Sequence, residues 1–190
     1  MQTFGETERA YFDDTTHLNY PYGLTTDGNN VWVVDSDGLR AVKYANDGAF
    51  LAQIGKTGFR YGTGQSLEFV ADVGVDSAGN IWLVDSDVNH ILKFDATGKY
   101  LSMLGKSYNS GQSNDRFSGP HSVAFDSAGN IYVSDSWNNR IQVFKSDGSY
   151  LATIGTTGVA GSDNAHFCNP QHIAIASNVL YITDACNHRV

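Results

Sequence analysis

Residues 131–137 read IYVSDSW, and this segment decides the fold because its pattern recurs along the chain. Three other segments have the same form: VWVVDSD at 31–37, IWLVDSD at 81–87 and LYITDAC at 180–186. The aspartates Asp35, Asp85 and Asp135 lie 50 residues apart, and Asp184 follows after 49. A fixed period of this length indicates a repeat architecture.

Each repeat has the pattern of β-strands separated by tight turns. In the third copy the expected strands are 122–125, 131–134, 141–144 and 150–154. The intervening segments are rich in Gly, Asn, Asp and Ser, which favour turns. The pattern predicts a four-stranded antiparallel meander, and no segment shows the periodicity of a helix.

A single meander of this kind cannot bury its bulky side chains, because they point to both faces. Trp82 and Leu83, for example, point to opposite sides of one strand. The copies must stack face to face, and radial stacking of four-stranded blades is the β-propeller. We expect an all-β propeller of about four blades forming a single domain over 1–190, with a linear β-solenoid as the alternative. The blades are expected at about 21–55, 71–105, 120–155, and 170–190 plus 2–5.

The two ends of the chain suggest how a ring closes. Thr3-Phe4-Gly5 lies 50 residues before Gln53-Ile54-Gly55, so it is predicted to complete the blade of 170–190. Building one blade from both ends hides the edges of the sheet. Two interpretations follow. The chain is a closed or nearly closed four-bladed unit, alone or completed by association, or it is part of a longer chain such as a six-bladed ring, which the stop at Val190 favours.

The composition argues against several classes of function. The 190 residues include 20 acidic and 12 basic ones, a formal net charge of −8. The basic residues are spread along the chain rather than clustered for phosphates, so we expect no nucleic-acid partner. No apolar run approaches the roughly 20 residues of a membrane-spanning helix. The N-terminus also does not have the pattern of a signal peptide.

The sequence resembles the NHL repeat family. The resemblance rests on Asn187-His188-Arg189-Val190, on Asn138-Asn139-Arg140-Ile141, and on the pattern from Pro120 to Phe144. The second repeat departs from it with Ala71 for proline and His90 for arginine. The resemblance implies a propeller that serves as a protein- or RNA-binding module, as an extracellular sensor domain or, in one branch, as a lyase.

Two local features are similar to that branch, the peptidyl-α-hydroxyglycine α-amidating lyase. Pro120-His121 is similar to the motifs whose histidines bind the lyase zinc, and Cys168 with Cys186 is similar to its disulfide-forming cysteines. A catalytic zinc needs three protein ligands. The other repeats carry Tyr22, Asp72 and Gln171 at the positions equivalent to His121. The resemblance therefore implies a metal-dependent lyase or hydrolase around His121 as an alternative function.

Two sets of corresponding residues carry the site predictions. The aspartates that end the second strands are expected to be structural, accepting backbone N–H bonds in a turn and meeting the basic residue five positions on. Those aspartates are Asp35, Asp85, Asp135 and Asp184, and the basic residues are Arg40, His90, Arg140 and Arg189. The second set varies between repeats and is expected to bind a ligand at one end of the channel: Tyr22, Asp72, His121 and Gln171. His121 and Asp72 are candidate ligands of zinc or calcium; alternatively, His121 is a hydrogen-bonded residue of the channel mouth.

Trp137 and the two cysteines complete the candidates. Trp137 lies among loops, and loops on a rigid scaffold commonly carry binding surfaces. Cys168 and Cys186 lie 18 residues apart in loops of one blade. They are predicted to form a disulfide, which would indicate an oxidising compartment, with two free thiols as the alternative.

Together these features favour non-catalytic recognition of a protein, peptide or glycan at a propeller face, in an extracellular or periplasmic protein. The alternatives are the metal-dependent lyase or hydrolase and a structural protein that assembles through unfinished blade edges. The sequence contains no phosphate-binding loop, CxxC pair, HExxH motif or nucleophile elbow.

Overall fold

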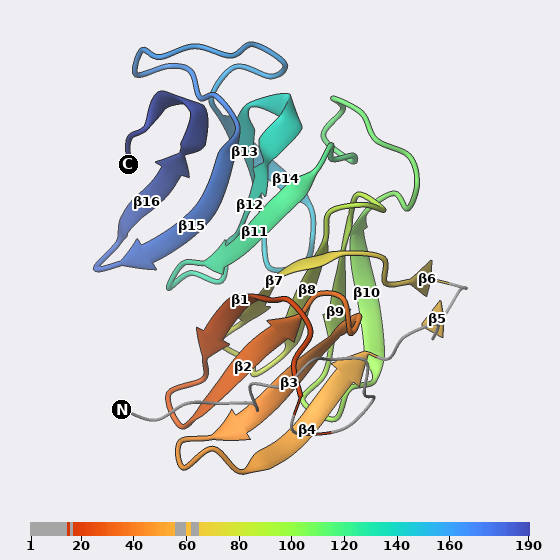
Figure 1. Cartoon of the computed structure of the whole chain (residues 1–190). Coiled ribbons are helices and arrows are strands. Elements are labelled where there is room, and N and C mark those ends of the chain that lie inside the picture. Colours follow the sequence, from red (N-terminus) through yellow and green to blue (C-terminus); the bar gives the residue numbers. More distant parts are fainter. Residues whose placement is uncertain (1–14, 16, 56–59, 62–64) are drawn as a thin grey trace.

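The fold consists of antiparallel sheets that follow one another in chain order (Figure 1). It is seen in a computed structural model that describes residues 15, 17–55, 60–61 and 65–190. The first blade comprises β1 (Pro21–Thr26), β2 (Asn30–Asp35), β3 (Arg40–Ala45) and β4 (Phe50–Gly55). The second comprises β7 (Val70–Val75), β8 (Ile81–Asp85), β9 (His90–Phe94) and β10 (Tyr100–Gly105). The third comprises β11 (Pro120–Phe125), β12 (Ile131–Asp135), β13 (Arg140–Phe144) and β14 (Tyr150–Ile154).

The described part of the fourth blade has two strands, β15 (Pro170–Ala176) and β16 (Val179–Asp184). Short 3-10 helices, η1 (Ser136–Asn138) and η2 (Ala185–Asn187), form the turns after β12 and β16. A two-stranded ribbon, β5 (Arg60–Tyr61) with β6 (Gln65–Ser66), lies between the first two blades in sequence. The predicted strand at Thr3-Phe4-Gly5 lies outside the described residues, so its pairing with 170–190 stays a prediction.

The blades pack face to face, as the sequence requires. The first strands of successive blades, β1, β7, β11 and β15, contact one another (Figure 1). One hydrophobic cluster joins the first and second blades through side chains such as Trp32 and Leu83, and another joins the second and third blades through Trp82 and Ile131. Trp82 is only 3% exposed. The propeller prediction is therefore confirmed.

The hairpins between the first two strands of the second and third blades are held by the same hydrogen bonds from backbone N–H groups to a turn aspartate. In the second blade, Asp76 Oδ1 accepts hydrogen bonds from the backbone N–H groups of Ala78 (3.0 Å) and Asn80 (2.9 Å). Gly79 has a φ of +80°, a conformation that glycine adopts without strain. Asp126 makes the same two bonds in the third blade. The turn residues thus fix where the second strand begins.

In three blades the repeated aspartate forms an ion pair with the arginine five positions on. Arg40, Arg140 and Arg189 donate through Nε to Asp35, Asp135 and Asp184 at 2.6, 2.7 and 2.8 Å.

The expected pairing of His90 with Asp85 is wrong. His90 Nδ1 lies 2.7 Å from Ser107 Oγ instead, and Asp85 accepts from the backbone N–H groups of Glu68 and Phe69. The imidazole is shorter than a guanidinium and has no fork of donors to offer the carboxylate.

Neighbouring blades are also joined by hydrogen bonds that run in one direction along the chain. The hydroxyl of Ser36 donates to the carbonyl of Val70 at 2.7 Å, and Ser86 and Ser136 donate likewise to Pro120 and Pro170. In each case a side chain after the second strand of one blade bonds the first strand of the next. No helix in the described part of the chain is long and apolar enough to cross a membrane.

Candidate functional site

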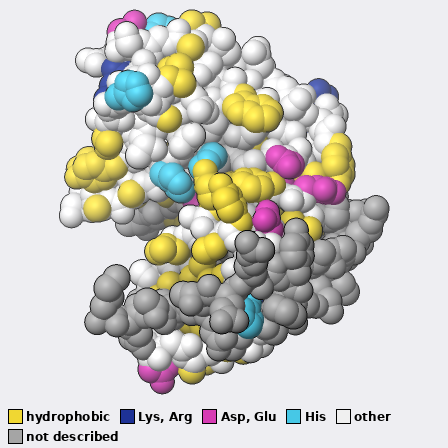
Figure 2. Space-filling view, in the orientation of Figure 1, with side chains coloured by type: hydrophobic (Ala, Val, Ile, Leu, Met, Phe, Trp, Pro, Cys, Tyr) yellow, Lys and Arg dark blue, Asp and Glu magenta, His cyan; other side chains and the backbone are white. Residues whose placement is uncertain are grey.

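A cluster of aromatic and imidazole rings lies where the first strands of the blades begin. We call it the mouth cluster; it consists of Tyr20, Tyr22, Phe69, His121 and His172. Tyr22 is central, with ring centroids 5.9 Å from Tyr20, 5.8 Å from Phe69 and 5.4 Å from His121. Figure 2 shows hydrophobic side chains beside histidines in the middle of this face, with carboxylates next to them. Four blades thus contribute to one surface.

His121 is held within this cluster. Its Nε2 lies 3.1 Å from the Tyr22 hydroxyl, and its ring packs edge-on against His172 with centroids 5.1 Å apart. Nδ1 is buried and makes no hydrogen bond within the described part of the structure. Burial lowers the pKa of His121 to about 4, and the charge of His172 acts in the same direction. His121 is therefore a neutral, hydrogen-bonded residue of the mouth at pH 7.

Asp72 lies behind the mouth cluster and is almost fully buried, with 7% exposed. Its Oδ2 accepts from the Ser122 hydroxyl (2.7 Å) and the Val123 N–H (3.2 Å), and its Oδ1 from the Val73 N–H (2.9 Å). Burial raises the pKa of Asp72 to about 6. The hydrogen bonds lower this pKa in part, and the attraction of His172 lowers it by the smallest amount. The carboxylate thus links the second blade to the third.

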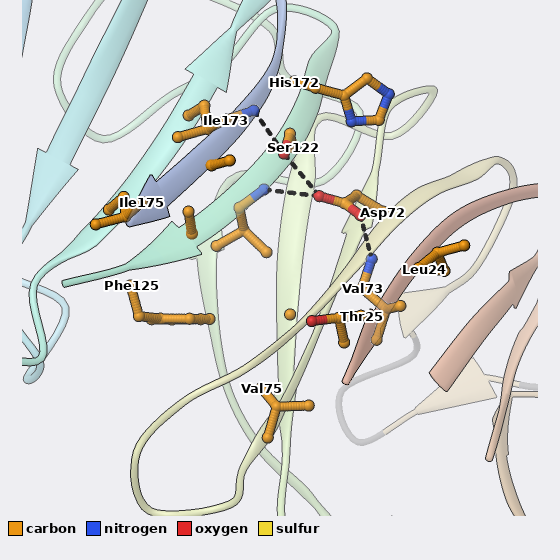
Figure 3. Close-up of a pocket in the computed structure, with 14 residues that line it drawn as sticks. Leu24, Thr25, Asp72, Val73, Val75, Ser122, Phe125, His172, Ile173 and Ile175 are labelled. Carbon is orange, nitrogen blue, oxygen red and sulfur yellow. Dashed lines mark hydrogen bonds between the residues drawn. The ribbon is translucent and has the colours of Figure 1, made fainter. Parts of the chain in front are cut away.

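A cavity of about 360 Å³ opens beside Asp72, between the first strands of the four blades. Figure 3 shows Asp72, Ser122 and His172 at one end of it and Phe125 and Val75 at the other. Leu24, Thr25, Ile173 and Ile175 contribute to the remaining wall. The cavity therefore has a polar end next to the mouth cluster and an apolar end deeper in the channel.

The structure corrects the alignment of Asp72 with the other predicted ligand residues. The residues paired with the repeated aspartates are Pro21, Val70, Pro120 and Pro170. The residues that follow them are Tyr22, Ala71, His121 and Gln171. Asp72 belongs one position further on, in the same row as Gly23, Ser122 and His172.

The cause of the misalignment is the first hairpin. Thr26 pairs with Val31, whereas Val75 pairs with Ile81, so the first connection is one residue shorter. An equal spacing from the repeated aspartates therefore does not identify equivalent residues in the first and second blades. Val70, rather than Ala71, occupies the proline position.

Close packing between the first strands depends on Gly23. A Cβ atom on Gly23 would lie 2.8 Å from both Asp72 Oδ1 and the carbonyl oxygen of Ala71. Only glycine lets β1 approach the second blade this closely. The smallest member of the row thus makes room for its charged member.

The other predicted site residues have no ring contact with this cluster among the described interactions. Trp137 is 70% exposed on η1, and its ring covers Gly119. Gln171 lies on β15, where its backbone carbonyl accepts a hydrogen bond from Ser134. Within the described ranges, no three His, Cys, Asp or Glu side chains form a group that could hold a metal ion. Zinc and calcium stay predictions from the sequence.

Cys168 and Cys186 are brought together as free thiols. The Cys186 N–H donates to the Cys168 carbonyl at 3.1 Å, and a hydrogen bond between the two thiols raises the pKa of Cys168. The disulfide itself stays a prediction. Thiol titration of the unfolded, unreduced protein is expected to find no free thiol after exposure to an oxidising buffer. Two reactive thiols would contradict it.

Comparisons with known proteins agree with the fold. The NHL repeat model matches residues 117–144 and 167–190, and no curated protein matches the chain. A streptogramin B lyase shares 19% identity at a TM-score of 0.62, over 88% of this chain and 49% of its own. An auxiliary nutrient-binding protein from Bacteroides ovatus shares 16% identity at a TM-score of 0.69, over 92% and 48%. A Bacteroides thetaiotaomicron protein of unknown function shares 16% at a TM-score of 0.74, over 90% and 46%. The chain spans about half the length of these proteins.

Proposed function

Starting from a chain whose residues 117–144 and 167–190 are NHL repeats of a β-propeller, we propose that it is a non-catalytic recognition module. It binds a protein, peptide or glycan at the mouth cluster. The observation that carries this proposal is the cluster itself: Tyr20, Tyr22 and His172 are exposed and come from two different blades, and His172 lines the polar end of a cavity.

Two physical arguments support the mouth cluster as the binding surface. Its residues differ from blade to blade, whereas the residues that maintain the blades recur, and surface that the scaffold does not need is free to carry specificity. Exposed tyrosines also supply contact area with few rotatable bonds, which keeps the entropy cost of binding low. Fold neighbours named as auxiliary nutrient-binding proteins are compatible with such a role, and with placement outside the cytoplasm.

The test is binding of the purified chain to glycan and peptide arrays, compared with a Tyr22→Ala variant. We expect the variant to lose most of the binding signal, tenfold or more, because Tyr22 contacts three other rings of the cluster. Tyr150→Ala is the matched control, since Tyr150 on β14 is also 40% exposed. The proposal is wrong if Tyr22→Ala and Tyr150→Ala retain equal binding, or if the native chain binds no glycan or peptide.

A further inference from the structure

We infer that the part of the ligand entering the cavity is an organic ammonium group on an apolar stem. This inference rests on the proposed function, because it takes the mouth cluster and the cavity behind it as the binding site. It adds the chemical class of the group that is bound.

The polar end of the cavity presents a carboxylate without a permanent cation. A buried carboxylate is normally paired with a positive charge. Asp35, Asp135 and Asp184 each have an arginine as described above, but the three hydrogen bonds to Asp72 all come from neutral donors. No Lys or Arg is among the described residues that line the cavity. Asp85 also has no arginine, but it does not line this cavity.

The surroundings of Asp72 favour a cation that arrives from solution. The rings of Tyr22 and His172 are stacked on each other beside this end of the cavity, with their centroids 6.4 Å apart. The Glu68, Asp37 and Asp87 side chains are exposed and belong to the same face, since Asp37 N–H bonds the carbonyl of Asn19 and Ser86 N–H bonds that of Phe69. An anion would meet the negative charges of Asp72 and of these carboxylates here, and His172 is the basic side chain that faces Asp72 at this end.

The other end of the cavity determines what the ammonium group is attached to. Val75 and Phe125 line this end and offer no charge and no side-chain hydrogen-bonding group. The adjoining wall holds Ile175 and the hydroxyl of Thr25. An apolar stem gains free energy by leaving water for such a wall. A small hydrophilic cation gains nothing from it. The two ends together select an amphiphilic amine over an inorganic ion.

The test compares the binding of a charged and a neutral probe that share the same apolar stem. Benzylammonium and benzyl alcohol have the same skeleton, and their affinities for the whole chain are measured by chemical-shift titration. We expect benzylammonium to bind about tenfold more tightly or better, the effect of one charge-assisted hydrogen bond. Methylammonium, which lacks the apolar stem, is expected to bind more weakly than benzylammonium.

Two variants locate the charge that is responsible. Asp72→Asn should reduce benzylammonium binding to the level of benzyl alcohol and leave the alcohol unchanged. Asp87→Asn is the control for the general negative field of the face and should change the ratio of the two affinities less than twofold. A circular-dichroism melt establishes that each variant is folded. If Asp72→Asn does not fold, the comparison of the two probes on the native chain tests the inference by itself.

The outcomes separate this inference from the proposed function. Equal binding of the charged and neutral probes overturns the inference but leaves a ligand site in the cavity. The inference is also overturned if Asp87→Asn and Asp72→Asn lose equal benzylammonium affinity, or if the native chain binds neither probe. The array test with Tyr22→Ala decides the proposed function independently, because it does not depend on the charge of the ligand.

Discussion

Replacing Asp135 by alanine should lower the free energy of unfolding by about 3–5 kcal/mol, the cost of leaving a buried charge without its partner. Both members of the pair are inaccessible, with Arg140 1% exposed and Asp135 0%. The variant keeps the Arg140 guanidinium and removes the only carboxylate it is described as bonding. Since typical domains are stable by 5–15 kcal/mol, this loss is a large fraction of the total.

The size of the effect follows from how many groups share this carboxylate. Besides Arg140, it accepts from the Ser118 N–H at 2.7 Å, from Asn138 Nδ2 at 2.9 Å and from Gln142 Nε2 at 3.1 Å. Arg140 in turn donates to the carbonyl of Gln112 at 2.9 Å. Alanine at 135 therefore releases the loop before the third blade together with the turn after β12.

Urea denaturation of the native chain and the variant measures this loss. Asp184→Ala is the matched comparison, because Asp184 holds the same position in the fourth blade but its partner Arg189 is 33% exposed. Water can replace part of that interaction, so we expect less than half the loss seen at Asp135. Equal losses at the two positions would show that burial of the pair is not what makes it stabilising.

Phe117→Ala is also expected to lower the free energy of unfolding by about 3–5 kcal/mol, in this case because it removes a buried ring. Phe117 lies in the connection between the second and third blades, yet it is fully buried in the cluster that joins them. Its ring packs edge-on against Phe144 at 5.8 Å. It also covers Gly105, where a Cβ atom would lie 2.7 Å from the ring. Truncation leaves a cavity that two rigid sheets cannot close.

Thermal and urea unfolding of Phe117→Ala measure this cost. Tyr108→Ala is the control, since Tyr108 is an aromatic residue of the same connection but is 67% exposed. We expect it to lose less than a third as much stability. If Tyr108→Ala were the more damaging change, the connection would be stabilised by its surface rather than by the inserted ring.

The blades could be predicted from the sequence because their signals are local. Alternating side chains and turn residues such as Asp126 and Gly129 act over a few positions, so each hairpin is encoded where it forms. The stacking followed from Trp82 and Leu83 on opposite faces of one strand. These are properties of a single repeat, and the repeat displays them several times.

The site was predicted only in part because it is made between repeats. Tyr22 and His121 were expected at the channel mouth, and the structure brings them within 3.1 Å. The sequence pattern points to Gln171 rather than to its neighbour His172, which the structure places in the cluster, and it aligns Asp72 one position out of register. Nothing within one blade reveals that β1–β2 has a shorter turn. The difference in turn length between the repeats is the sequence signal that reveals the correct register.

The serine hydroxyls that link the blades all donate toward the next blade along the chain, so the effect of inserting an extra blade depends on where it is inserted. Ser136 supplies the bond received at Pro170, but the corresponding residue of the fourth blade is Ala185, which has no hydroxyl to donate. A duplicated blade inserted after the third blade would receive the hydrogen bond from the Ser136 hydroxyl on its first strand. A blade inserted after the fourth would receive no such bond from Ala185 and would need another contact to hold it there.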